Sequence, residues 1–272
     1  MLALLNLRDP ERITDLNVIL VGQIRMTKLH EYANKVFSQN GEDGIISHLF
    51  SIIGTTNKKC IEMCAGEGFE CNTANLIINS GFEGMLFDGK KENVERGVSF
   101  FNSKGVGDMV KYIHKWITKS NTIGDILKYK YTGEIDLMSL DMDGVDYWIL
   151  KMLVIDTKVI SPRVIVLEYN DIFGPDQSIT VPYDDCFDGW TDTYGGPNYC
   201  GASLRAFINL LKEDYKFVGC NELGFNGFFV KRTFEKIEEV LNIEEECFQF
   251  EKVKFGMKYR WPRVQHRKWI TV

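Results

Sequence analysis

The spacing of apolar residues changes several times along the chain. From Ile13 to about Phe37, apolar residues recur at mixed helical spacing, which indicates one or two amphipathic helices. A further helix is expected in FSQNGEDGIISHLFSIIG, where Ser38 or Asn40 stands at an N-cap position and Gly54 ends the apolar run. The first of these patterns predicts helical structure ahead of the main domain.

Beyond this helix, short apolar runs alternate with longer helical patterns. Such alternation is typical of a parallel sheet whose strands are joined by crossover helices. The last two runs flank the short turn ELGFN, so they predict an antiparallel hairpin at one edge of the sheet. The sequence therefore predicts an α/β domain with seven strands: KCIEMC, EGMLFDG, VKYIHKWI, IDLMSLD, RVIVLEYN, YKFVGCN and GFFVKR.

A long segment between residues 171 and 201 interrupts this alternation and is rich in aromatic residues. Loops of this length in compact domains are usually lids or binding loops. In an open α/β sheet, ligands bind at the carboxyl ends of the strands, and we expect the segment to lie there. We therefore divide the chain into an N-terminal helical extension (1–36), a main domain (37–235) that carries this lid, and a C-terminal extension (236–272).

Composition and charge argue against several classes of protein. The formal net charge of −6 disfavours a protein that coats nucleic acid, because such binding needs a cationic surface. The stretch KYRWPRVQHRK near the C-terminus is basic, and it is either a solvated tail or a binding edge for an anionic substrate. We expect a small-molecule ligand rather than a nucleic acid.

Cysteine usage and hydropathy bear on the cellular location. The seven cysteines form no C-x-x-C pair, which argues against a disulfide framework or a zinc ribbon and favours reduced thiols. No apolar run approaches the roughly 20 residues of a transmembrane helix. The N-terminus becomes charged too early for a signal peptide. The sequence therefore predicts a soluble cytoplasmic protein without a membrane span.

The turn after the first predicted strand, EMCAGEG from Glu62 to Gly68, contains the first candidate chemistry. Small residues at the end of a strand let the backbone approach a ligand closely. A dinucleotide loop would have a third glycine where this chain has Cys71, and Glu67 would repel a diphosphate. These two residues disfavour a nicotinamide cofactor.

S-adenosylmethionine suits the same residues better, because it carries an ammonium group, a sulfonium and a ribose diol but no phosphate. Glu62 can attract the ammonium group, and the backbone of Gly66–Gly68 can lie against the sugar. Asp88, at the end of the next predicted strand, can accept hydrogen bonds from both ribose hydroxyls. The alternative for Asp88 is a turn residue before Gly89.

Several blocks along the chain together resemble the FkbM-like class I methyltransferases, which include sugar O-methyltransferases of polysaccharide and antibiotic pathways. The resemblance implies a Rossmann-like sheet of seven strands with an antiparallel last strand, S-adenosylmethionine above the first two strands, and methyl transfer to a hydroxyl. It also implies that Gln39 and Asp43 contact the methionine end of the cofactor, the alternative being helix capping. In chain order, the blocks are FSQNGEDGI, IEMCAGEGFECNT, GMLFDG, MSLDMDGVDYWI, VIVLEYN, GASLRAFINLL and LGFNGFFVKR.

The chain departs from that group at three positions: Cys64 replaces a glycine, Glu67 an aspartate, and Lys90 an acid that often follows FDG. After the third strand, Trp116 and Ile117 are expected to form the wall for adenine, the alternative for Trp116 being core packing. The expected cofactor contacts are Gln39, Asp43, Glu62, Cys64, Gly66, Gly68, Asn72, Asp88, Gly89, Trp116, Ile117 and Asp141.

Acidic residues follow the fourth and fifth predicted strands. Asp141 and Asp143 are two residues apart and would share a face on a regular strand. A sugar hydroxyl must lose its proton as it attacks the methyl group, so Asp141 is the first candidate for the base and Asp143 the second. A histidine is the alternative base. Asp141, Glu168 and Asn170 could also hold Mg²⁺, which some similar macrolide sugar methyltransferases use to acidify the hydroxyl.

The lid is expected to supply the acceptor site. Aromatic rings pack on the apolar faces of sugars, although the same rings could simply hold the loop together. A nucleotide-linked sugar would give Arg260, Arg263 and Arg267 of the basic stretch a ligand. The candidate acceptor contacts are Tyr183, Asp184, Trp190, Tyr194 and Tyr199.

The sequence thus predicts an S-adenosylmethionine-dependent O-methyltransferase that acts on a sugar hydroxyl, with a nucleotide-linked or polysaccharide sugar as acceptor. A second hypothesis is a non-catalytic module that binds S-adenosylmethionine, which the cysteine at position 64 keeps open. The third, a NAD-dependent sugar dehydrogenase, is disfavoured by the loop. The sequence leaves the oligomeric state open.

Overall fold

The computed structural model describes residues 28–191 and 198–272. Most of the predicted N-terminal extension, and Tyr194 of the lid, lie outside the described residues. The described chain begins with a short 3-10 helix, η1 (Leu29–Tyr32), close to the first turn of the main domain.

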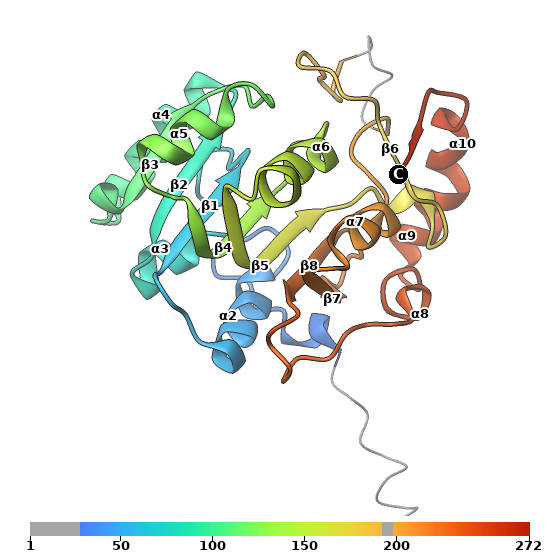
Figure 1. Cartoon of the computed structure of the whole chain (residues 1–272), viewed down its shortest axis with the longest axis horizontal. Coiled ribbons are helices and arrows are strands. Elements are labelled where there is room, and N and C mark those ends of the chain that lie inside the picture. Colours follow the sequence, from blue (N-terminus) through green and yellow to red (C-terminus); the bar gives the residue numbers. More distant parts are fainter. Residues whose placement is uncertain (1–27, 192–197) are drawn as a thin grey trace, which may run out of the picture.

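Seven strands form one sheet in the order β3-β2-β1-β4-β5-β8-β7 (Figure 1). The pairs from β3 to β5 are parallel, whereas β8 is antiparallel to both β5 and β7. All seven predicted strands are present, and the last strand of the sheet in the chain is the antiparallel one, so the predicted Rossmann-like methyltransferase fold is confirmed. The strands are β1 (Lys59–Met63), β2 (Glu83–Asp88), β3 (Val110–His114), β4 (Gly133–Leu140), β5 (Ile160–Glu168), β7 (Tyr215–Cys220) and β8 (Asn226–Lys231).

Helices cover both faces of the sheet. Alternate residues of a strand point to opposite faces, and in β1 the side chain of Cys60 enters one apolar cluster while Ile61 and Met63 enter another. The cluster around Cys60 includes residues of α2 (Glu42–Ile53), α3 (Ala74–Ser80) and α4 (Lys91–Ser103). The cluster around Ile61 includes residues of α5 (Thr122–Lys128), α6 (Asp146–Leu150) and α7 (Leu204–Leu211).

Burial of the sheet on both faces explains why the strands are continuously apolar. Three short helical turns also lie in the connections between strands. These are the 3-10 turns η2 (Gly107–Met109) and η4 (Asp171–Phe173), and the π-helical turn η3 (Lys151–Asp156).

Helix α2 begins later than its sequence predicts. The N-cap is Gly41 in the left-handed conformation (φ 84°), not Ser38 or Asn40. Ser38 still contributes, because its hydroxyl oxygen accepts a hydrogen bond from the backbone N–H of Asp43 at 3.0 Å. The chain therefore needs a glycine turn between the predicted cap and the helix.

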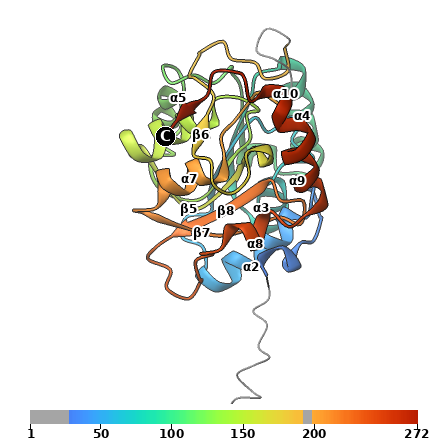
Figure 2. The same ribbon diagram turned by 90° about the vertical axis from the view of Figure 1, so that its right-hand side faces the viewer.

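The C-terminal extension packs against the main domain along one side, which Figure 2 views directly. The final strand β9 pairs antiparallel with β6 (Ile179–Thr180) at the start of the lid. The basic stretch is therefore folded back onto the lid and is not a free tail. The elements are α8 (Ile243–Cys247), α9 (Glu251–Phe255), the π-helical turn η6 (Gly256–Arg260), α10 (Trp261–Val264) and β9 (Ile270–Thr271).

The seven cysteines, all of which lie within the described residues, form no disulfide bond with one another. Within residues 28–191 and 198–272, no helix combines the length and the apolar character needed to cross a membrane.

Candidate active site

The loop after β1 requires an unusual backbone. Cys64, Gly66 and Gly68 have φ angles of 63°, 59° and 78°, the left-handed region that favours glycine. A Cβ at position 68 would also lie 2.8 Å from Cε2 of Phe101. Glycine at positions 66 and 68 is thus explained by backbone geometry, and Cys64 occupies a conformation that suits glycine.

We expect replacements of Cys64 to differ according to the φ angle that they tolerate. Cys64→Gly should retain stability, whereas Cys64→Val should lower the free energy of unfolding by about 1–2 kcal/mol, because a β-branched residue is strained at this φ. Urea denaturation of both variants measures the difference. Equal loss in the two would show that the thiol, and not the backbone, governs this position.

Glu62 joins the end of β1 to the segment that leads into α3. Its carboxylate accepts hydrogen bonds from the backbone N–H groups of Asn72 and Thr73, both at 2.8 Å, and from the Thr73 hydroxyl at 2.6 Å. Burial raises the pKa of Glu62, and the hydrogen bonds from Thr73 and Asn72 oppose that rise. Glu62 therefore fixes the shape of the loop in addition to lining the cavity in front of it.

The carboxylate of Asp88, at the end of β2, is also engaged in hydrogen bonds within the protein. It accepts hydrogen bonds from the backbone N–H of Gly66 at 3.0 Å, the backbone N–H of Lys90 at 2.8 Å and the Asn93 amide at 3.0 Å. A carboxylate has about four lone-pair positions, so roughly one remains for a ribose hydroxyl.

A cavity of about 330 Å³ lies between this loop, the turn before α2 and the ends of β4 and β8. Six of the expected cofactor residues line it: Gln39, Glu62, Cys64, Gly66, Asn72 and Asp141. The other residues lining it include four that were not expected to contact cofactor, namely Glu42, Glu67, Glu70 and Asn226.

The turn before α2 places Glu42, and not Asp43, at the cavity. One Asp43 oxygen accepts hydrogen bonds from the backbone N–H groups of Val36, Phe37 and Ser38, so Asp43 holds the turn together. Glu42 is almost fully buried and accepts hydrogen bonds from the side-chain amide of Asn226 at 2.7 Å. Sequence reasoning missed Glu42 although the acid stands beside Asp43, because consecutive helix residues point in different directions.

A second cavity of about 50 Å³ shares Cys64 with the first and is also lined by Gly89, Trp116 and Ile117. A Cβ at position 89 would lie 3.0 Å from Cε3 of Trp116, so the indole ring packs directly on this glycine. The indole N–H donates to the backbone oxygen of Asp185 in the lid at 2.8 Å. Trp116 is 49% exposed, which argues against core packing as its role.

Three acids meet at the ends of β4 and β5. Asp141, Asp143 and Glu168 each place a carboxylate oxygen within 4.8 Å of the other two. Desolvation of the Asp141 carboxylate and the charge of the neighbouring Asp143 raise its pKa to about 7, against an opposing hydrogen bond with Glu168, although the residue as a whole is exposed. Burial and the Asp141 carboxylate raise the pKa of Glu168 well above its ordinary value. Asp141 and Glu168 therefore share a proton near neutral pH.

The turn that follows Asp141 has a strained backbone and is held by hydrogen bonds within the turn. Asp143 has φ 51°, in the left-handed region. Asp146 accepts hydrogen bonds from the backbone N–H groups of Met142 at 2.7 Å and Gly144 at 3.0 Å, and its burial raises its pKa to about 6. Asp146 thus fixes the turn that carries Asp143 to the cluster.

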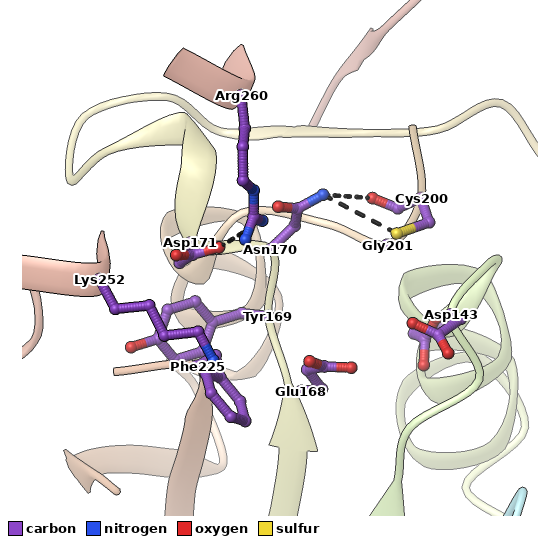
Figure 3. A pocket seen from close by; sticks show the side chains of 11 residues that line it. Asp143, Glu168, Tyr169, Asn170, Asp171, Cys200, Gly201, Phe225, Lys252 and Arg260 are labelled. Carbon is purple, nitrogen blue, oxygen red and sulfur yellow. Dashed lines mark hydrogen bonds and ion pairs between the residues drawn. The ribbon is translucent and has the colours of Figure 1, made fainter. Parts of the chain in front are cut away.

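Glu168 and Asp143 also line a third cavity, of about 130 Å³, which we call the acceptor pocket (Figure 3). Asn170 lines it too, but both ends of its amide are engaged. The amide N–H group donates to the backbone oxygen of Cys200 at 3.1 Å, and the oxygen accepts from the backbone N–H of Ile172 at 3.4 Å. As a metal ligand, Asn170 would have to use the oxygen that also accepts from Ile172.

The described lid residues have different positions. Trp190 donates its indole N–H to Asp143 at 2.9 Å, and Asp184 lines the cavity beside Trp116. Tyr183 accepts a hydrogen bond from the backbone N–H of Lys119 at 2.7 Å. The hydroxyl of Tyr199 donates to the backbone oxygen of Lys268, so Tyr199 joins the lid to the C-terminal segment.

None of the four histidines lines the three cavities, all of which are built from the described part of the chain. The acids at the ends of β4 and β5 are therefore the candidate proton acceptors.

No family model matches the chain, and no curated protein sequence matches it. Among solved structures, the chain is similar to the N-terminal domain of EvdMO1 with SAH bound, at 14% identity, covering 72% of this chain and 82% of that one with a TM-score of 0.44.

It is also similar to a putative caffeoyl-CoA O-methyltransferase from Staphylococcus aureus, at 10% identity, with 80% and 99% of the two chains covered and a TM-score of 0.46. For a putative O-methyltransferase from Klebsiella pneumoniae, the identity is 10%, the covered shares are 78% and 93%, and the TM-score is 0.45. Two of these three structures are named as putative O-methyltransferases, and each similarity concerns the fold alone.

Proposed function

We propose that this protein is an S-adenosylmethionine-dependent O-methyltransferase of the FkbM-like type that acts on a sugar hydroxyl. The observation that carries the proposal is the junction of two cavities at the acid cluster. Asp141 lines the cavity beside the loop after β1, and Asp143 and Glu168 line the acceptor pocket. The three carboxylates meet within 4.8 Å, where a methyl donor and an acceptor hydroxyl would face each other.

The charge of the larger cavity supports S-adenosylmethionine as the cofactor. Five acids line it, namely Glu42, Glu62, Glu67, Glu70 and Asp141. Two of them form ion pairs, Glu67 with Arg96 at 2.6 Å and Glu70 with Lys35 at 3.3 Å, so the acids remain in excess. Acids attract a sulfonium and an ammonium group but repel a diphosphate, which disfavours the dehydrogenase alternative. The cavity between Gly89 and Trp116 would take the adenine.

The proposed chemistry needs one proton to leave the acceptor. Asp141 accepts the hydroxyl proton as the oxygen attacks the methyl group, and the negative charge of Asp143 makes that proton acceptor more basic. The remaining contribution is alignment of oxygen, methyl carbon and sulfur by the two cavities.

Mg²⁺ is a further element of the proposal. Asp141, Asp143 and Glu168 offer three hard oxygen ligands at one point, the donor set that this ion prefers. A bound Mg²⁺ would lower the pKa of the acceptor hydroxyl. The ion would also remove the repulsion among the three carboxylates.

Isothermal titration with S-adenosylhomocysteine, followed by a mass-spectrometric assay with sugar and nucleotide-sugar acceptors, tests the proposal. We expect binding and transfer of one methyl group to a hydroxyl. Binding without transfer to any acceptor would favour the non-catalytic module, and absence of binding would contradict both. Full activity in excess EDTA would remove Mg²⁺ from the proposal and leave the carboxylate as the base.

A further inference from the structure

The acceptor pocket has charges of opposite sign on its walls. Glu168, Asp143 and Asp146 stand at the end shared with the acid cluster. Lys252 of α9 and Arg260 of η6 enter from the C-terminal extension. Figure 3 shows these two cations on the side of Glu168 away from Asp143.

Lys252 forms no direct ion pair in the described part of the chain, and its charge acts at longer range on Asp171, where it opposes the rise in that carboxyl's pKa. Its ammonium nitrogen lies 4.2 Å from the centroid of the Phe225 ring, which forms part of the pocket wall. The Lys252 side chain is exposed to solvent, so the packing of the helix does not depend on its charge. A cation held over an aromatic ring is positioned but not neutralised.

Arg260 is only partly satisfied. One terminal nitrogen donates to Asp171 at 2.9 Å, and this ion pair neutralises one of the two positive charges on this wall. The Nε atom of Arg260 is buried and has no hydrogen-bond partner. Since a guanidinium has five N–H donors in a planar fork, Arg260 retains donors for a second anion.

We propose that Lys252 and Arg260 bind an anionic group of the acceptor, so that the substrate is a sugar bearing a phosphate or a carboxylate. The anionic group lies between Lys252 and Arg260, and the hydroxyl to be methylated points to Asp141, Asp143 and Glu168. This inference rests on the proposed function, because it assigns the acceptor of the same reaction. It also gives a role to the folding of the basic stretch onto the lid.

Charge balance favours this orientation over the reverse. An anion placed next to Glu168 and Asp143 would be repelled by two acids, whereas Lys252 and Arg260 outnumber Asp171 at the other wall. A neutral sugar would leave the Lys252 charge without a ligand. The two walls therefore specify both the class of acceptor and its direction in the pocket.

Lys252→Met and the matched control Lys258→Met test the inference. Lys258 belongs to the same extension and also lies over an aromatic ring, Tyr259 at 5.0 Å, but it does not line the pocket. The probes are a hexose 1-phosphate, a UDP-hexose, a hexuronate and a neutral hexose, each titrated calorimetrically into protein saturated with S-adenosylhomocysteine.

We expect the charged probes to bind more tightly than the neutral hexose. Lys252→Met should weaken them by about tenfold or more, the usual effect of losing a charge-assisted contact, and leave the neutral hexose unchanged. Lys258→Met should leave every probe within about twofold. A preference for the phosphate probes over the hexuronate would identify phosphate as the anion, and the reverse preference would identify a carboxylate.

Two outcomes separate this inference from the proposed function. If S-adenosylhomocysteine binds and the charged probes bind no better than the neutral hexose, the anion site is overturned and the methyltransferase proposal stands. Equal weakening by Lys252→Met and Lys258→Met would also overturn the site, since it would show a general effect of net charge. Loss of S-adenosylhomocysteine binding in the unmodified protein would remove the proposed function itself.

Discussion

Replacing Asp141 with asparagine is expected to lower the rate of methyl transfer by about 10²–10⁴-fold, the usual contribution of a positioned general base. Asparagine keeps the shape of the side chain but cannot accept the acceptor proton. Binding of S-adenosylhomocysteine should weaken much less, because the loop after β1 and the Trp116 cavity remain intact. Initial rates by mass spectrometry and calorimetric titration measure the two effects.

Asp176 provides the matched control for this substitution. It is an exposed aspartate that lines none of the three cavities, so Asp176→Asn should retain the full rate. Comparable losses in Asp141→Asn and Asp176→Asn would contradict the assignment of Asp141. A loss confined to cofactor binding would make Asp141 a cofactor ligand and move the role of base to Asp143.

The same carboxylate predicts how the reaction depends on pH. Desolvation of its carboxylate and the charge of Asp143 raise the pKa of Asp141 to about 7, so the base is protonated and inactive below that pH. We expect kcat/KM to rise as pH increases through about 7 and then to level off. A pH–rate profile measured without added metal checks this expectation, and a flat profile between pH 6 and 8 would contradict it.

Stability should change in the opposite direction. Because the folded protein raises the pKa of Asp141 above the ordinary carboxyl value of about 4, this group stabilises the fold fully below pH 4. That contribution is lost as pH rises through about 7, the folded pKa. Thermal unfolding of Asp141→Asn should therefore show a smaller decline in Tm between pH 5 and 8 than the unmodified protein.

The sheet was predictable because each strand is buried on both faces and so forms a continuous apolar run. The strands from KCIEMC to GFFVKR are all present, and the loop glycines at 66 and 68 have the left-handed φ angles that small residues allow. These features depend on residues that are close together in the chain, so one sequence is sufficient to predict them.

The contents of the site depend on contacts between distant segments and were less predictable. Gly41 shifts the start of α2, and this shift sends Asp43 into the turn and Glu42 into the cavity. Arg260 reaches the acceptor pocket because the C-terminal extension folds back, so that η6 contacts η4 and β9 pairs with β6. The spacing of residues along the chain does not encode either event.

A second substitution should have a large effect on stability alone. Asp136 of β4 is fully buried, and Arg163 of β5 donates to it at 2.7 Å. The backbone N–H groups of Thr56 and Lys58 also donate to this carboxylate, at 2.9 and 2.7 Å. Burial alone would raise the pKa of Asp136, but Arg163 and these N–H groups outweigh burial and lower it.

Arg163→Met should lower the free energy of unfolding by about 3–5 kcal/mol, because it leaves a buried carboxylate without its cation. The matched control is Lys231→Met, which removes a more exposed partner of Glu134, also on β4, and should cost about 0–1 kcal/mol. Urea denaturation at pH 7 measures both values.

The stability that Asp136 contributes is present above pH 4 and is lost as pH falls through its lowered pKa, so the difference between the variants should shrink in acid. Since Asp136 lines none of the three cavities, binding of S-adenosylhomocysteine to the folded fraction should be unchanged. A loss in Arg163→Met no larger than that in Lys231→Met would show that the backbone N–H groups alone compensate the buried charge.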